Sequence, residues 1–241
     1  MNDGDARRWS LCTVTQVEEA KIILRMLPVF VSSVLGYLPI PLLLTFTVQQ
    51  GGTMDTRLGA TNVPPASLFV VPIVFQMLIL VVYDRAVVPW LRRATGYAGG
   101  VTHLQRIGVG FASNVVALAV AAAVEGRRRA EGGAAATEMS VFWLTPQFFL
   151  LGVSDVTSFP GLLEFFNSEA PRGMKSIATA LFWCEIGLAS LLATFLVQAV
   201  NSITRHGHQG QGGWLEGSSL DSSHLDLFYW VVTVVGLIGF L

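Results

Sequence analysis

The stretch Pro146–Ser176, PQFFLLGVSDVTSFPGLLEFFNSEAPRGMKS, begins as an apolar helix and then places a carboxylate, Asp155, among apolar residues. About twenty predominantly apolar residues cross a hydrocarbon core roughly 30 Å thick, and Ser140–Leu163 meets that length. Asp155 is therefore predicted to lie inside the membrane, about 12 Å from the end of the span at Leu163. A charge at that depth is costly unless it faces protein or a water-filled cavity, which makes Asp155 a candidate functional residue. The alternative is a protonated or hydrogen-bonded aspartate that only helps helices to pack.

The composition is that of an integral membrane protein. Of the 241 residues, 52% are hydrophobic and only 13% are charged, whereas a soluble domain carries about 25% charged residues. The net charge of −1 gives no reason to expect a nucleic-acid partner. The polar residues 1–21 hold no apolar core beside a cleavage site, so they are not predicted to be a signal peptide.

The chain divides into a lead-in, residues 1–21, predicted to be cytosolic, and a bundle of six transmembrane helices over residues 22–241. The predicted fold class is an all-α membrane protein. The six apolar segments are Ile22–Val48, Ala66–Leu91, Leu104–Val124, Ser140–Leu163, Ile177–Val200 and Leu225–Leu241. The last is at the short limit for a span.

The lysines and arginines predict a cytosolic N-terminus, since cytosolic loops are enriched in these residues. With that orientation the inner side carries Arg7, Arg8, Lys21, Arg25, Arg85, Arg92, Arg93, Arg106, Arg172 and Lys175. The outer side carries Arg57, Arg127, Arg128, Arg129 and Arg205. The cluster Arg127–Arg129 is the exception to the rule, and Gly126–Thr137 is predicted to be an exposed loop.

Two of the spans have a composition that predicts their packing. Prolines at positions 28, 39 and 41 predict a bent first span, because proline removes a backbone donor. Either the bend serves gating, or the prolines are simply tolerated, as they commonly are in membrane helices. In the third span, small residues from Gly108 to Ser113 predict close contact with another helix. Asn114 in the same span is expected to form an interhelical hydrogen bond.

Three further acidic or basic positions are candidates for function. Glu185 lies in the fifth span about 12 Å from its inner end, at a depth similar to that of Asp155. Whether the two carboxyl groups face each other is open; if they do, one tends to hold a proton, which suits proton coupling. Asp84 and Arg85, at the inner end of the second span, either latch helix ends or simply flank the membrane.

No enzyme chemistry is predicted, because the sequence contains no phosphate-binding glycine loop, nucleophile elbow or paired cysteine or histidine motif. An intramembrane enzyme would have only the two carboxylates in its favour. The loop with His206, His208 and His224 is read as a solvated polar loop in preference to a metal site. No cofactor is expected.

The chain resembles the C-terminal half of a plant transporter of the nitrate and peptide transporter family. That family belongs to the proton-dependent oligopeptide transporters of the major facilitator superfamily. The matching pieces follow the family's order and cover nearly the whole chain: CTVTQVEEAKIILRMLP, TVQQGGTMD, VPPASL, YDRAVVPWLRRATG, THLQRIGVG, PQFFLLGVSDV, LEFFNSEAPRGMKS and SSHLDLFYW. GVSDV and HLDLFYW look most like the peptide-transporter-like branch.

The resemblance implies that the six helices are the family's seventh to twelfth and that residues 1–21 belong to its central cytosolic loop. Such transporters hold substrate between two six-helix halves and alternate its access. Asp155 occupies a position where most of the family has a cavity-lining glutamate that, in peptide carriers, meets the substrate's amino group. Asp84, Arg85 and Glu164 match positions near the cytosolic mouth, where gating contacts form. Glu185 and Trp183 are added as candidates for the same binding site as Asp155.

Three departures separate this chain from the family pattern. The N-terminal six helices are absent, and with them a proton-binding glutamate and arginine cluster. Pro39–Leu44 replaces a stretch that usually holds a polar residue, and Glu185 replaces a small or apolar one.

Two functional hypotheses follow. The first is half of a proton-coupled symporter for peptide, nitrate or another small solute, with the proton as coupling ion. It would lie in the plasma or vacuolar membrane and act with an N-terminal half, a full-length relative or a second copy. The alternative is a truncated, non-transporting protein that binds or regulates full-length relatives, or a degenerate fragment.

Overall fold

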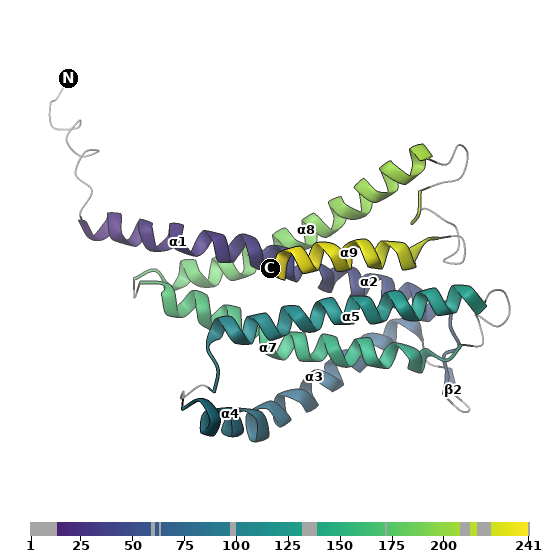
Figure 1. The fold of residues 1–241 in the computed structure, drawn as a ribbon, viewed down its shortest axis with the longest axis horizontal. Coiled ribbons are helices and arrows are strands. Elements are labelled where there is room, and N and C mark those ends of the chain that lie inside the picture. Colours follow the sequence, from purple (N-terminus) through teal and green to yellow (C-terminus); the bar gives the residue numbers. More distant parts are fainter. Residues whose placement is uncertain are drawn as a thin grey trace.

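The structure is built almost entirely of helices, as the six apolar segments predict (Figure 1). A computed structural model describes residues 14–58, 61–62, 64–96, 100–131, 139–171, 173–207, 213–215 and 223–240. The main helices are α1 (Val14–Tyr37), α2 (Pro39–Gly52), α3 (Val70–Val82), α4 (Val88–Thr95), α5 (His103–Glu131), α7 (Thr145–Glu169), α8 (Lys175–Gly207) and α9 (Leu225–Phe240). Short elements join them: the hairpin of β1 (Arg57–Leu58) and β2 (Thr61–Asn62), the 3-10 helices η1 (Pro65–Phe69) and η3 (Val141–Leu144), and the π-helical turn η2 (Tyr83–Val87).

Five helical segments of the described chain are long and apolar enough to cross a membrane. They are Val17–Gly52, Ser67–Thr95, His103–Ala130, Val141–Glu169 and Lys175–Arg205; Leu225–Phe240 is a shorter apolar helix. The predicted fold class, an all-α membrane bundle, is confirmed. The first helix begins at Val14, before the predicted start of the span at Ile22.

The predicted bend in the first span lies at Leu38, between α1 and α2. Pro39 and Pro41 carry no amide hydrogen, so the carbonyls of Leu35 and Tyr37, four residues earlier, receive no helical hydrogen bond from them. The third proline, Pro28, lies within α1. The break places Tyr37, the last residue of α1, in the middle of the bundle.

Helices α5 and α7 run side by side through the centre of the molecule (Figure 1). A Cβ built on Gly110 would lie 2.7 Å from the Ser158 Cβ and 2.9 Å from its main-chain nitrogen, so only glycine allows this approach. The Ser113 hydroxyl donates to the carbonyl of Leu150 (2.8 Å), and the Asn114 amide donates to the carbonyl of Gly36 on α1 (3.3 Å). The predicted close packing and interhelical hydrogen bond of the third span are thus present.

Replacing Gly110 by alanine is expected to destabilise the bundle, because the added methyl group meets the α7 main chain. Overpacking of this kind costs about 1 to 3 kcal/mol. Gly126, also on α5, is the matched control, since nothing lies within 4 Å of a Cβ built there. Thermal unfolding in detergent should show a lower midpoint for Gly110→Ala and an unchanged or higher one for Gly126→Ala. Equal midpoints would contradict the packing of α5 on α7.

The predicted exposed loop Gly126–Thr137 is wrong over its first residues, because α5 continues to Glu131. Its arginines are held by neighbouring groups. The Arg127 guanidinium lies 4.6 Å from the centre of the Trp143 ring, Arg128 is buried, and Arg129 pairs with Asp226 at the start of α9. Residues 132–138 lie outside the described part of the chain.

The helices differ greatly in how much of their surface the bundle covers. Half of the most apolar window is buried in each of the segments that contain α5 and α7, against 11% for Ser67–Thr95 and 22% for Lys175–Arg205. Figure 1 shows the α3–α4 segment and the C-terminal part of α8 diverging from the centre on opposite sides. Large apolar side chains, among them Met77 and Val81 on α3 and Leu191 and Phe195 on α8, remain exposed.

Candidate functional site

Asp155 lies in the middle of α7, and its side chain is half-buried. It makes no hydrogen bond or ion pair with any residue in the described part of the chain. The hydroxyl of Tyr37, which the break after α1 places here, is within electrostatic range of both Asp155 and Glu185. The structure therefore gathers the two predicted carboxyl groups around one tyrosine from a third helix.

Glu185 on α8 is completely buried, and neither of its carboxyl oxygens has a hydrogen-bond partner among the described residues. The neighbouring Ser33 hydroxyl on α1 donates instead to the carbonyl of Phe30 (2.9 Å). The Tyr37 hydroxyl is also buried without a hydrogen-bond partner among the described residues, and its neighbour Ser158 donates to the carbonyl of Ser154 (2.7 Å). The centre of the bundle thus contains polar groups whose hydrogen-bonding capacity is unused.

Trp183, the third predicted binding residue, lies two positions before Glu185 and points away from it. Its side chain is 59% exposed. Its ring contacts those of Phe159 on α7 (6.2 Å between centroids) and Phe182 (5.5 Å). Trp183 therefore lies on the outer surface of the α7–α8 contact. Its partner on α7, Phe159, is about one helical turn beyond Asp155.

The predicted gating residues separate into two groups at the end of the bundle where α5 begins and α7 ends. Glu164 pairs with two residues of α5, His103 (3.2 Å) and Arg106 (3.5 Å). Asp84 and Arg85 lie in η2, both exposed, and form no ion pair within the described part of the chain. The structure thus brings Glu164 into a contact that the sequence did not predict and leaves the other two residues on the surface.

Arg106 links this contact to the region of Asp155. Its Nη2 donates to the carbonyl of Val156 (3.1 Å), the residue after Asp155, and its guanidinium lies 4.9 Å from the centre of the Tyr83 ring. Pro160, four residues after Val156, has no amide hydrogen with which to bond that carbonyl. Arg106 supplies the missing donor and so stabilises α7 where its hydrogen-bond ladder is interrupted.

We expect Arg106→Met to destabilise the protein by about 1 to 3 kcal/mol, the cost of an unsatisfied buried carbonyl. Pro160→Ala restores a main-chain donor for Val156, so the same arginine substitution should cost less in that background. The measurement is a double-mutant cycle on the unfolding midpoint in detergent. Equal costs of Arg106→Met in both backgrounds would show that the Val156 carbonyl does not depend on Arg106.

A second ionic group, which is buried, lies at the opposite end of the bundle. Arg128 forms a two-pronged ion pair with Glu125, from Nε to Oε2 (3.0 Å) and from Nη2 to Oε1 (2.8 Å). The amide of Gln50 on α2 donates to Glu125 Oε2 (2.7 Å), and all three side chains are at most 1% exposed. This group joins α5 to α2. The sequence analysis missed it, although a glutamate three residues before an arginine is a known spacing for a helical ion pair.

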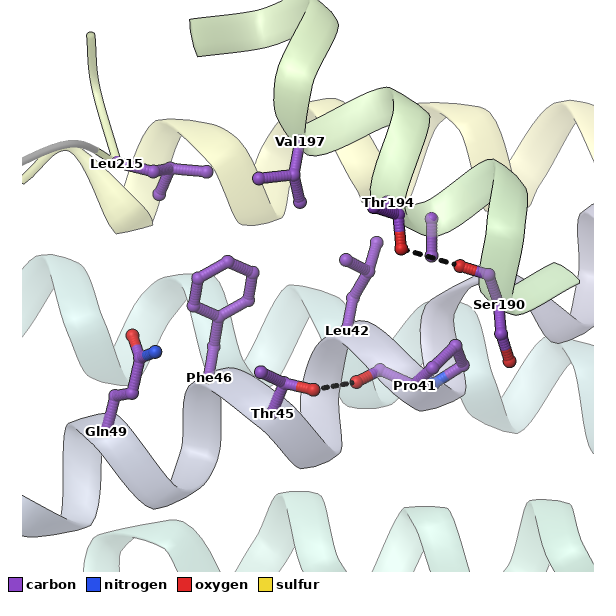
Figure 2. A pocket seen from close by; sticks show the side chains of 10 residues that line it. Pro41, Leu42, Thr45, Phe46, Gln49, Ser190, Thr194, Val197 and Leu215 are labelled. Atoms are coloured by element: carbon purple, nitrogen blue, oxygen red, sulfur yellow. Dashed lines mark hydrogen bonds between the residues drawn. The ribbon is translucent and has the colours of Figure 1, made fainter.

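A cavity of about 510 Å³ lies between α2 and α8. Its lining on α8 runs from Ser190 to Val197, about one to three helical turns beyond Glu185. Figure 2 shows its walls: Pro41, Leu42, Thr45, Phe46 and Gln49 on one side, and Ser190, Thr194, Val197 and Leu215 on the other. The Thr45 and Thr194 hydroxyls donate to carbonyls of their own helices (2.8 and 3.0 Å). Volumes of a few hundred Å³ are typical of small-molecule sites.

No metal site is found among the described residues. His224, one of the three histidines considered, contacts Arg129 through Nδ1 (3.1 Å). The side chain of His206 and all of His208 lie outside the described part.

Comparison with known proteins identifies the family. A family model described as the POT family matches residues 3–215. The chain belongs to the POT family. It is also similar to two curated proteins of Arabidopsis thaliana, Protein NRT1/ PTR FAMILY 4.6 (41% identical, 95% of this chain and 40% of the relative) and 4.5 (41%, 97% and 42%). The resemblance found in the sequence is confirmed.

Solved structures of POT transporters have the same fold. An auto-inhibited POT family peptide transporter superimposes with a TM-score of 0.72 at 20% identity, over 93% of this chain and 41% of its own. The POT family transporter PepTSo, from an in meso crystal structure, superimposes with a TM-score of 0.73 at 18% identity. The match covers 97% of this chain and 43% of the PepTSo chain. This POT-family chain is thus an integral membrane protein with a transporter fold that spans about two fifths of the length of its relatives.

Proposed function

We propose that the chain is one six-helix half of a proton-coupled solute symporter that works by alternating access. The observation that carries the proposal is Asp155, a half-buried carboxylate in the middle of α7 with no partner among the described residues. A carboxylate at that depth costs free energy unless something neutralises it. A proton or a cationic group of a solute, such as the amino group of a peptide, would do so. The family supports peptide or nitrate as the first solutes to test.

The exposed apolar faces of α3 and α8 support a second half as partner. We take the partner to be a separate six-helix unit that corresponds to the remaining length of the relatives. The alternative partners to test are a full-length relative and a second copy of this chain. The exposed Asp84 and Arg85 would pair across that contact. Glu164, held by Arg106, would stay with this half and keep the end of α7 against α5.

Orientation and location form part of the same proposal. The distribution of lysine and arginine favours a cytosolic N-terminus, and the plant relatives make the plasma membrane and the vacuolar membrane the two locations to examine. Protease protection of an N-terminal tag in sealed vesicles tests the orientation. In vesicles whose cytosolic face is outside, a cytosolic tag is digested while the vesicles are still sealed. Digestion that occurs only after the vesicles are opened would contradict a cytosolic N-terminus.

The function is tested by solute uptake into proteoliposomes. The chain is reconstituted alone and together with the six N-terminal helices of a full-length relative, and uptake of labelled dipeptide and nitrate is followed with and without an inward proton gradient. We expect uptake that requires both the second half and the gradient. Absence of uptake in every arrangement, from protein shown to be folded and inserted, would contradict transport.

The exposed apolar faces equally fit the alternative, a non-transporting protein that binds full-length relatives. Co-expression with a tagged full-length relative distinguishes the two functions. Stable co-purification that changes the relative's transport, from a chain that moves no solute in either arrangement above, would establish the regulator. If the chain neither co-purifies with the relative nor supports uptake, the remaining hypothesis is a degenerate fragment without a function.

A further inference from the structure

We propose that Glu185 is a proton-binding site of this chain, loaded with a proton in the arrangement of helices seen here and unloaded when α8 moves away from α1. The proposal rests on the proposed function for its role in transport. The site itself rests on burial, missing partners and the neighbouring helices.

The environment of Glu185 disfavours the ionised form of its carboxyl group. Its side chain is fully buried, both oxygens lack hydrogen-bond partners, and no ion pair to it forms within the described part of the chain. Burying an ionised carboxylate without a partner is far more costly than burying a neutral carboxyl group. The protonated form is therefore the one that this packing accommodates.

The described groups near Glu185 bring no positive charge. Ser33 on α1 lies beside its carboxyl group, and α8 itself contributes the exposed thiol of Cys184 next in sequence. The Tyr37 hydroxyl on α1 is within electrostatic range of Glu185, as it is of Asp155 on α7. Among the described residues, none of these neighbours supplies a cation that would stabilise a carboxylate. A proton is the cation that we propose neutralises Glu185.

A cavity lies near Glu185 along the chain. Ser190, which lines the cavity between α2 and α8 (Figure 2), is five residues beyond Glu185, about 7.5 Å along the helix axis. The two residues lie on different sides of α8, because five residues turn a helix by about 140° more than a full circle. The other wall of the cavity begins at Pro41, just after the break at Leu38 that positions Tyr37. A movement of α8 that opens its contact with α1 would connect Glu185 to this cavity.

The unloading step is a simple proton transfer. The O–H bond of the Glu185 carboxyl group breaks, its proton passes to a water molecule that enters from the cavity, and the carboxylate remains in a now hydrated site. Reprotonation reverses the step and allows α8 to close again on α1. Closure is thus favoured only when the proton is present.

The first test reads the protonation state directly and requires no transport. Infrared spectroscopy of the whole chain in lipid at neutral pH, carried out in the Asp155→Asn background so that Asp155 contributes no band, should show the carbonyl stretch of a protonated carboxylic acid. In this background Glu185→Gln should remove the band, whereas Glu164→Gln, which changes a half-exposed glutamate, should leave it. Absence of the band in the Asp155→Asn chain, or its persistence after Glu185→Gln is added, would overturn the proposal even if the chain proves to be no carrier.

The second test uses the reconstituted pair of halves. We expect Glu185→Gln to keep solute exchange, measured as counterflow without a pH gradient, and to lose at least tenfold in accumulation driven by the gradient. Full gradient-driven accumulation by Glu185→Gln would overturn a coupling role. Loss of both activities would also overturn it, if infrared spectra and gel filtration show that the variant is folded.

Discussion

Arg128→Met is expected to lower the stability of the protein more than any other single substitution considered for this chain. It leaves the Glu125 carboxylate buried with only the Gln50 amide as a described partner. Removing one member of a buried ion pair costs about 3 to 5 kcal/mol, because the remaining charge is uncompensated. Unfolding in detergent, followed by circular dichroism, measures the loss.

Arg127→Met is the matched control for this prediction. Arg127 is the neighbouring residue of the same type, but its side chain is exposed, and the Trp143 ring is one of its contacts. It should shift the unfolding midpoint only slightly, since a cation–π contact at an exposed site contributes about 0.5 to 1 kcal/mol. Combining Glu125→Leu with Arg128→Met should recover part of the stability, because no buried charge then remains. A midpoint for Arg128→Met equal to that of Arg127→Met would show that the pair is not buried as described.

Asp155→Asn is expected to abolish uptake driven by the proton gradient in the reconstituted pair of halves. Asparagine keeps the size and one acceptor oxygen of aspartate but can neither take up a proton nor carry the negative charge that attracts a cationic group. Proton-driven accumulation should fall to the level of empty liposomes. Uptake of labelled dipeptide with and without the gradient is the measurement.

Asp155→Glu controls for the carboxyl group itself. Glutamate restores the charge and the proton site on a side chain one methylene longer, and it is the residue that the family resemblance places at this position. This variant should therefore retain gradient-driven uptake. Wild-type rates in Asp155→Asn, or equal losses in both variants, would remove Asp155 from the site.

The helical fold could be read from the sequence because each signal was local. Six apolar runs predict the spans, and all six are helical, five of them long enough to cross a membrane. The prolines after Tyr37 predict the interruption between α1 and α2, and the small residues around Gly110 predict the close packing of α5; both are present. The family followed from short motifs in the right order. These features depend on residues close together in the chain, so a single sequence is enough to recognise them.

The contacts of the site could not be predicted, because they join helices that are far apart in the chain. Nothing local indicates that Arg106 donates to the carbonyl left free by Pro160, or that Tyr37 comes within electrostatic range of both Asp155 and Glu185. The end of α5 was mistaken for a loop because three arginines normally mark solvent. Arg128 is buried only because Glu125 and Gln50 meet it there, and the contact with Gln50 requires the fold.

The central claim, that solute and proton move together through a site on this chain, is tested most directly by the proton flux that the solute causes. Proteoliposomes with both halves are loaded with a pH-sensitive dye at equal pH on the two sides, and dipeptide or nitrate is added outside. The account predicts acidification of the lumen that depends on the solute and is absent in Asp155→Asn. Solute entry without any change in luminal pH would contradict proton coupling.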